Sequence, residues 1–313
     1  MYKNKILITW HYLLPLKKEY KRILKKEKIS YDIKSVNPSL NEIQLLKIIN
    51  KYDGIICGDD EISKRVIDKA KRLKVISKWG TGLNSINVNY AKKKGIKVYN
   101  SPKAFVESVS VYTFGLLINL ARGILNINSD VLEKKWPKYS GIELKNKKIG
   151  IFGYGNIGKK IASIGKSLEM NVLINDINLK LKNQVIKKNL EFVSKKKLLN
   201  NCDFIILATD LNKTSYHLLS SKEFKQVKKG VIIINISRGP TIDENALNKS
   251  LKSNKIGGLG LDVFEHEPLK KNSPIRKFKN KVLSSHNAFN TREAVLRTNF
   301  DCINNLVKGL RKR

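Results

Sequence analysis

Several apolar runs in the second half of the sequence each lead directly into a polar side chain. Arg238, Asp262 and His286 stand just past such runs, and Glu267 comes shortly after Asp262. Arginine can hold a carboxylate with two parallel hydrogen bonds, and histidine can give and take back a proton near neutral pH. A glutamate beside that histidine would hold the imidazole in orientation. These residue types suit the interconversion of a carbonyl and an alcohol next to a carboxylate.

A glycine-rich turn joins an apolar run to a helical pattern near the middle of the chain. Its first glycine permits a tight turn, its second lets the backbone approach a pyrophosphate, and its third lets the helix pack on the strand. The free N–H groups at the start of the helix then face the phosphates. The turn therefore predicts a dinucleotide site made by Gly153, Gly155, Asn156, Ile157 and Gly158.

The acidic residue after the next apolar run indicates which dinucleotide is bound. Asp176 follows the run 171–175, about 20 positions after Gly158, where an acid can accept the ribose hydroxyls. A carboxylate there favours NAD and repels the 2′-phosphate of NADP. A glycine turn alone also occurs in ordinary loops, but strand, turn, helix and acid in this order favour the cofactor interpretation.

Short apolar runs alternate with helical patterns along the whole chain, which indicates parallel sheets in an α/β fold. Long helical patterns at 105–125 and 292–310 separate and follow two series of predicted strands. About two domains fit the 313 residues, and the fold expected is two doubly wound parallel-sheet domains. The predicted strands are 5–10, 54–58, 74–78 and 97–99, then 148–152, 171–175, 203–208, 231–236, 258–261 and 281–284.

The composition narrows the classes of partner and compartment. The formal net charge is +36, but lysines crowd the whole chain, so we expect no specific nucleic-acid partner. Three cysteines lie far apart, which predicts no metal site and no disulfide and fits buried thiols in the cytoplasm. The first 16 residues mix apolar with polar and charged side chains, so they do not resemble a signal peptide. The run 108–121 is too short to span a membrane, so no membrane association is expected.

Five motifs follow one another along the chain: the segment 78–86, the glycine turn, the segments 235–239 and 261–268, and the pair Ser285–His286. In this order they resemble the D-isomer-specific 2-hydroxyacid dehydrogenase family, which includes D-3-phosphoglycerate dehydrogenase. The resemblance implies a Rossmann NAD-binding domain, 101–287, inserted into a flavodoxin-like substrate domain, 1–100 with 288–313. It also implies a D-2-hydroxy acid or 2-keto acid as the small-molecule substrate and a homodimer built through the nucleotide domain.

The same resemblance assigns roles to individual residues. Arg238 is expected to bind the substrate carboxylate and carbonyl oxygen, with His286 as the acid/base and Glu267 as its partner. The loop Gly80, Thr81 and Gly82 resembles a backbone cradle for the substrate carboxylate. Asp262 matches the residue that contacts the nicotinamide amide, while Thr209 and Ile236 match positions along the cofactor. His11 and His217 receive no role, and His266 is taken as structural.

Other features leave the substrate and two alternatives open. Trp79, Phe105 and Phe289 depart from the family's usual pattern and could reshape the pocket. Lys78 would favour a phosphorylated or dicarboxylate substrate, and the segment 210–217 resembles a subgroup for which a sugar acid is conceivable. A formate or phosphite dehydrogenase shares this frame, although formate enzymes carry glutamine where Glu267 stands. A non-catalytic, NAD-sensing interaction protein of corepressor type is the other alternative.

Overall fold

The chain folds into two compact units. The computed structural model describes residues 2–34, 39–253 and 255–311. One unit comprises Met1–Phe105 with Asn290–Arg313, and the other comprises Val106–Phe289. The sequence had placed these boundaries at 100/101 and 287/288.

The first unit is built on a five-stranded parallel sheet with the order β2-β1-β3-β4-β5. This is the flavodoxin-like order of doubly wound folds. The edge strand β2 was missed in the sequence because Ser30 and Asp32 interrupt its apolar residues and only Ile29 is buried. The strands are β1 Asn4–Ile8, β2 Ile29–Ile33, β3 Gly54–Cys57, β4 Val75–Lys78 and β5 Lys97–Tyr99.

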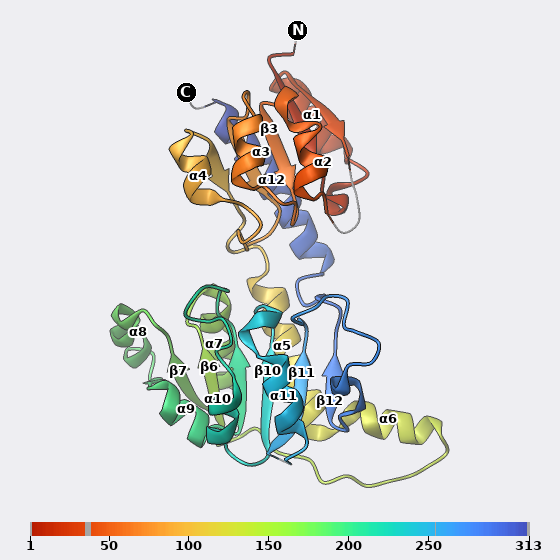
Figure 1. Cartoon of the computed structure of the whole chain (residues 1–313). Coiled ribbons are helices and arrows are strands. Elements are labelled where there is room, and N and C mark those ends of the chain that lie inside the picture. Colours follow the sequence, from red (N-terminus) through yellow and green to blue (C-terminus); the bar gives the residue numbers. More distant parts are fainter. Residues whose placement is uncertain (1, 35–38, 254, 312–313) are drawn as a thin grey trace. The chain divides into compact units, whose positions relative to one another are not determined.

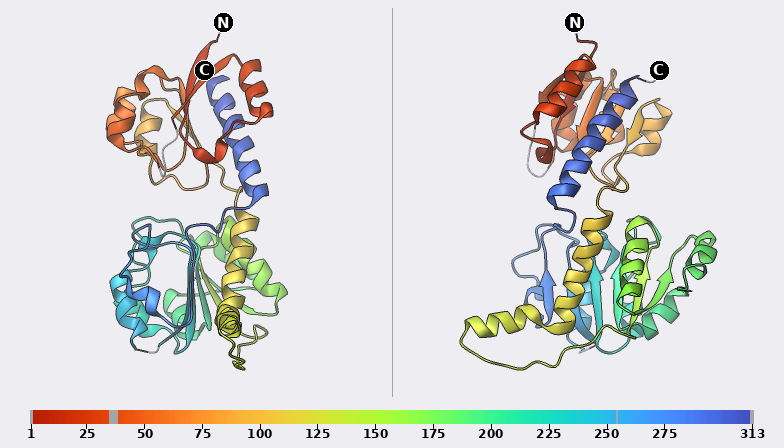
Figure 2. Two further views of the ribbon diagram at one scale, coloured as in Figure 1. Left: turned by 90° about the vertical axis from the view of Figure 1, so that its right-hand side faces the viewer. Right: turned by 180° about the vertical axis from the view of Figure 1, so that it is seen from behind.

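Helices cover both faces of this sheet, with α1 and α12 on one side and α2, α3 and α4 on the other (Figure 2). The last helix, α12, packs on β3 and β4, so the end of the chain completes the first unit. The helices are α1 Lys18–Lys26, α2 Glu42–Leu46, α3 Lys64–Lys69, α4 Val88–Lys93 and α12 Arg292–Arg311, with 3₁₀ turns at η1 His11–Leu13 and η2 Ile49–Lys51.

The second unit holds a seven-stranded parallel sheet with the order β12-β11-β10-β9-β6-β7-β8. Counted from β6, this is the Rossmann order with one further strand. The prediction of two doubly wound parallel sheets is therefore confirmed. The strands are β6 Lys148–Phe152, β7 Asn171–Asn175, β8 Glu191–Phe192, β9 Phe204–Leu207, β10 Val231–Asn235, β11 Ile256–Leu261 and β12 Lys281–Leu283.

In the second unit, α5 and α7 lie on one face of the sheet and α9, α10 and α11 lie on the other (Figures 1 and 2). Long runs such as 231–235 are buried throughout, as expected for strands covered on both faces. The helices are α5 Val106–Arg122, α6 Ile124–Leu132, α7 Asn156–Ser167, α8 Lys182–Ile186, α9 Lys195–Asn201, α10 Ser221–Gln226 and α11 Glu244–Leu251, with 3₁₀ turns at η3 Leu179–Leu181, η4 Gly239–Thr241 and η5 Pro274–Lys277.

The long helix predicted for 105–125 is present as α5 over 106–122, but it ends earlier than predicted because the chain breaks at Gly123. This glycine adopts φ +64°, a left-handed conformation that ends α5, and α6 starts after a bend of 62°. Among the described residues no single helix is long and apolar enough to cross a membrane; the bent pair α5–α6 meets that test by length and composition only.

Candidate active site

The three proposed catalytic residues follow three neighbouring strands. Arg238 comes just after β10, Glu267 lies in the connection after β11, and His286 comes just after β12. Because these strands are adjacent and parallel, the residues gather at the same carboxyl edge of the sheet. The structure thus brings together side chains that are far apart in the sequence.

His286 and Glu267 form a direct pair. Nδ1 of His286 lies 2.9 Å from Oε2 of Glu267, and each side chain is just over one-third exposed. The backbone N–H of His286 donates to the carbonyl of Asp262 at 2.7 Å. Since Nδ1 is engaged, Nε2 is the nitrogen that can face a substrate; it has no hydrogen bond within the described part of the chain.

The electrostatic surroundings keep Glu267 ionised. Burial raises the pKa of Glu267, but the hydrogen bond and charge of His286, with the charge of Arg238, outweigh it and hold the pKa below its ordinary value. The other carboxylate oxygen, Oε1, accepts from the backbone N–H of Phe264 at 3.0 Å. Glu267 is therefore a fixed anion beside the imidazole.

Arg238 and Glu267 lie on backbone segments that pack closely. The residue after the arginine is Gly239, and a Cβ there would lie 1.8 Å from the carbonyl carbon and oxygen of Phe264. Only glycine allows this approach, so Gly239 is a site residue that the sequence reasoning missed. Its place directly after Arg238 in the Ser-Arg-Gly segment was the available signal. Arg238 itself donates from Nη1 to the carbonyl of Ser237 at 2.6 Å.

Asp262 is buried behind the histidine. Its Oδ1 accepts from the backbone N–H groups of Asn287 at 2.8 Å and Ala288 at 3.2 Å. Asp262 therefore fixes the backbone directly after His286. Its predicted contact with the nicotinamide amide stays a prediction.

The glycine turn after β6 has the shape that a pyrophosphate requires. Gly153 adopts φ +96°, and a Cβ on Gly158 would lie 2.0 Å from the carbonyl oxygen of Gly153. A Cβ on Gly155, in contrast, would meet no heavy atom within 4 Å. The second glycine thus borders open space at the start of α7, where the N–H groups of Asn156 and Ile157 begin the helix.

Two polar side chains stand beside this turn. Asp176, directly after β7, accepts from the backbone N–H of Tyr154 at 2.7 Å, which places its carboxylate against the glycine turn. Thr209, after β9, has a buried Oγ1 without a hydrogen-bond partner among the described residues. An orphaned hydroxyl beside an open glycine fits a nucleotide, so the residues present suit the cofactor. Ile236, buried after β10, continues this edge.

Comparison with known proteins identifies the family. Residues 114–288 match the model of the D-isomer-specific 2-hydroxyacid dehydrogenase NAD-binding domain. The chain belongs to this family. A glyoxylate reductase of Thermofilum pendens is 36% identical over 273 residues, 85% of this chain and 80% of that protein. A hydroxypyruvate reductase of Thermotoga maritima is 33% identical over 306 residues, 95% of this chain and 96% of that protein.

Solved structures agree with this assignment. A D-lactate dehydrogenase from Aquifex aeolicus, complexed with NAD and lactic acid, has a TM-score of 0.83 and 26% identity over 96% of this chain and 93% of that one. Membership of this family makes the chain an NAD-dependent 2-hydroxyacid dehydrogenase. We name two parts of the carboxyl edge of the second unit after the predicted roles of their residues. The cofactor end comprises Asp176, the glycine turn and Thr209, and the reaction end comprises Arg238, Glu267 and His286.

The predicted carboxylate loop belongs to the first unit, directly after β4. Gly80 adopts φ +107°, its carbonyl accepts from the N–H of Ser101 at 2.9 Å, and the carbonyl of Thr81 accepts from Asn100 Nδ2 at 2.7 Å. These bonds fix the backbone of Gly80 and Thr81. Its role in holding the substrate carboxylate stays a prediction.

Lys78 lies buried at the start of this loop. Its Nζ pairs with Asp59 at 3.0 Å and donates to the carbonyl of Trp79 at 2.9 Å. The charge of Lys78 is thus already compensated by a carboxylate, which weakens the sequence-based argument for a phosphorylated or dicarboxylate substrate.

Proposed function

We propose that this enzyme reduces a short 2-keto acid to the D-2-hydroxy acid with NADH and catalyses the reverse reaction with NAD. The observation that carries the proposal is the His286–Glu267 pair at 2.9 Å. The two residues follow β12 and β11, and Arg238 follows β10, the next strand of the sheet. A proton donor, an anion that orients it and a carboxylate clamp are the groups that this reaction needs.

The residues divide the work of the reaction between them. When bound, NADH supplies a hydride equivalent, and the glycine turn with Asp176 would hold its pyrophosphate and ribose. Arg238 binds the substrate carboxylate and polarises the carbonyl. His286 gives its Nε2 proton to the carbonyl oxygen, while the Glu267 carboxylate holds Nδ1 and stabilises the charged imidazole. In the oxidation of the hydroxy acid, the neutral His286 accepts that proton.

The names of the relatives point to small substrates. Glyoxylate reductases and a hydroxypyruvate reductase match most of the chain, so these two keto acids are the first substrates to test. A phosphoglycerate dehydrogenase from Archaeoglobus fulgidus matches at 32% identity, so a phosphorylated hydroxy acid belongs in the same panel. Sugar-derived 2-keto acids complete it.

A substrate panel tests the proposal directly. Absorbance at 340 nm would be followed with NADH and each keto acid, and with NAD and formate as the control. We expect NADH oxidation with glyoxylate or hydroxypyruvate and no reduction of NAD by formate. Tight NADH binding without turnover of any keto acid would instead support the non-catalytic, NAD-sensing alternative.

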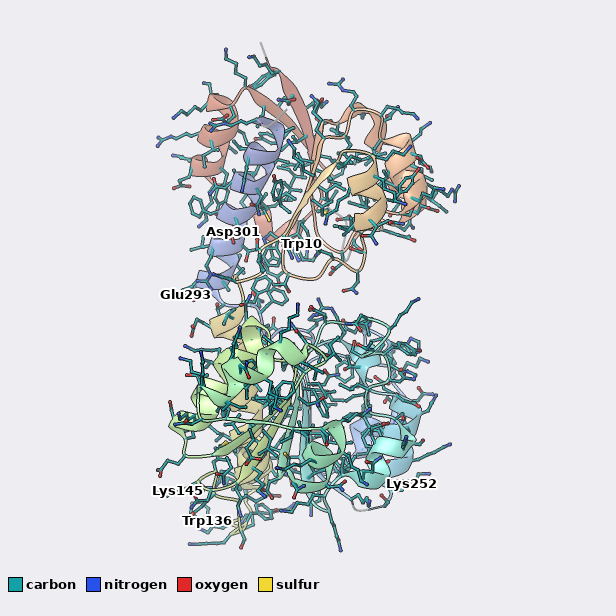
Figure 3. The ribbon with its side chains drawn as sticks, turned by 90° about the vertical axis from the view of Figure 1, so that its left-hand side faces the viewer. Trp10, Trp136, Lys145, Lys252, Glu293 and Asp301 are labelled. Atoms are coloured by element: carbon teal, nitrogen blue, oxygen red, sulfur yellow. The ribbon has the colours of Figure 1, made fainter. Side chains whose placement is uncertain are left out.

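We also propose that two copies of the chain associate through α5 and α6. Helix α6 extends beyond the β12 edge of its own sheet (Figure 1), and large apolar residues near it are open to solvent, among them Leu132 at 76% and Trp136 at 80% (Figure 3). Exposed apolar surface of this kind marks protein interfaces. The two helices contain only Glu107, Arg122 and Asp130 as charged residues, so two strongly cationic chains would repel each other least here.

Sedimentation of the wild type and of Leu132→Glu would test this association. We expect a dimer for the wild type and a monomer for the variant; a monomeric wild type would refute the proposal. Lys145→Glu, a change outside both helices, serves as the matched surface control.

The cytoplasm is the proposed compartment. Cys57, Cys202 and Cys302 are all free and buried, which suits a reducing environment. The lysines are spread over both units, so we propose no specific nucleic-acid partner. Cell fractionation tests the cytoplasmic location. In a DNA-binding assay we expect only salt-dependent binding without sequence preference.

A further inference from the structure

A second histidine–glutamate pair lies in the same unit as the first. Nε2 of His217 is 2.7 Å from Oε1 of Glu265, and both side chains are largely buried, at 30% and 19% exposed. Glu265 stands two positions before Glu267 in the connection after β11. His217 lies in the connection between β9 and α10, which also contains Thr209 of the cofactor end.

His217 contacts two of the segments that carry proposed catalytic residues, those of Arg238 and Glu267. Its backbone N–H donates to the carbonyl of Pro240 at 2.8 Å, two residues after Arg238, while its ring holds Glu265. The ring of Tyr216 stacks on the imidazole with centroids 4.0 Å apart. The backbone of His217 adopts φ +49°, which residues other than glycine rarely adopt, so these contacts must hold the residue in place.

The segment that carries Glu267 depends on few anchors. It has no regular secondary structure between β11 and η5. Glu265 is held there by its backbone N–H, which donates to Glu244 Oε1 at 2.8 Å, and by its side chain, which pairs with His217. The backbone of Phe264 and Glu265 also packs against Gly239. Loss of the His217 contact would leave Glu267 free to shift from His286.

We infer that His217 is a positioning residue: it fixes the Glu267 segment against the Arg238 segment and so sets the His286–Glu267 pair. The inference rests on the proposed function of that pair. His217 acts through its contacts with Glu265 and Pro240 and takes no part in the proton transfer itself. Its effect on the reaction is exerted through Glu267.

Two substitutions separate the hydrogen bond from the ring. His217→Phe keeps an aromatic ring on Tyr216 but removes the donor to Glu265, whereas His217→Gln can place an amide N–H near the position of Nε2. We expect kcat to fall at least tenfold in the phenylalanine variant and to recover most of that loss in the glutamine variant. The Kd for NADH should stay within twofold of wild type in both, because no contact to the glycine turn is changed.

Glu265→Leu tests the same contact from the other side. We expect a loss of kcat similar to that of His217→Phe, and we expect the double variant to be no worse than either single one, as for residues that act as one unit. Lys213→Ala, an exposed residue of the same connection, is the matched control and should behave as wild type. If His217→Phe fails to fold, the kcat of Glu265→Leu compared with that of the wild type still tests the role of the His217–Glu265 contact.

A measurement that needs no turnover keeps this inference separate from the proposed function. The downfield imidazole N–H signal of His286, observed by NMR, should persist in the wild type and in His217→Gln and be lost in His217→Phe. Wild-type kcat and an unchanged His286 signal in His217→Phe would overturn the inference. If the wild type turns over no keto acid but His217→Phe still loses the His286 signal, only the proposed function is overturned.

Discussion

The two ends of the carboxyl edge in the second unit are built in different ways. At the cofactor end, the site is made of backbone: a glycine turn with a left-handed Gly153, a close approach at Gly158 and open space at Gly155. At the reaction end, the site is made of side chains: Arg238, Glu267 and His286 come from connections without regular structure. The cofactor end depends on the shape of the chain, and the reaction end depends on residue identity.

This difference predicts how substitutions divide between kinetic parameters. Changes at the reaction end remove interactions made as the proton moves, so they should lower kcat and leave NADH binding unchanged. Changes at the cofactor end alter binding of the dinucleotide, so they should act on its affinity and on the choice between NAD and NADP. The following predictions test this separation.

The largest effect is expected for His286→Ala. Removal of a positioned general acid costs about 10²–10⁴-fold, so kcat should fall by that range while the Kd for NADH stays as in the wild type. Steady-state kinetics at 340 nm and NADH fluorescence measure the two quantities. An unchanged kcat would show that His286 is not the general acid. A weaker affinity for NADH would show that the cofactor end and the reaction end are not independent.

Glu267→Gln should have the next largest effect. The amide keeps the size of the side chain but replaces a charge-assisted hydrogen bond with a neutral one, which corresponds to about 10–100-fold in kcat. NADH affinity is again expected to be unchanged. A loss as small as twofold would mean that orientation of the imidazole does not depend on the carboxylate.

The lowered pKa of Glu267 adds a prediction about stability. A carboxylate whose pKa is lower in the folded chain stabilises the fold above its unfolded value, near the ordinary 4.5, and loses that contribution as pH falls through the folded value. The melting temperature of the wild type should therefore be higher than that of Glu267→Gln at pH 5–7. The difference between the two melting temperatures should shrink below pH 4.5. A difference in melting temperature that grows in acid would contradict the lowered pKa of Glu267.

Much of this site could be predicted because its signals are local. The glycine turn and Asp176 lie within one strand–helix–strand unit. Arg238 and His286 come shortly after the ends of strands, and Glu267 lies in the connection that follows β11. What the sequence could not show were contacts across unrelated segments. His217 received no role because its partners, Pro240 and Glu265, are distant in the sequence. The break of the long helix at Gly123 was missed because a single glycine is often tolerated within a helix.

Arg238→Lys should have a smaller effect that falls on the substrate. An ammonium group cannot reproduce the two parallel hydrogen bonds of a guanidinium, so roughly tenfold is expected in kcat/KM for the keto acid. We expect KM for the keto acid to rise, kcat to fall, and KM for NADH to stay unchanged. An altered KM for NADH alone would place Arg238 at the cofactor end instead.

Asp176→Asn should have the smallest effect and the only one confined to the cofactor end. The asparagine oxygen can still accept from the N–H of Tyr154, so the glycine turn should keep its shape, and only the negative charge is lost. A like-charge contact at about 4 Å is worth about 1 kcal/mol in water, so the preference for NADH over NADPH should fall by about fivefold. The ratio of kcat/KM for the two cofactors measures this. Since the charge lies far along the edge from β12, kcat with saturating NADH should not change; a lower kcat would show that the two ends of the edge act together.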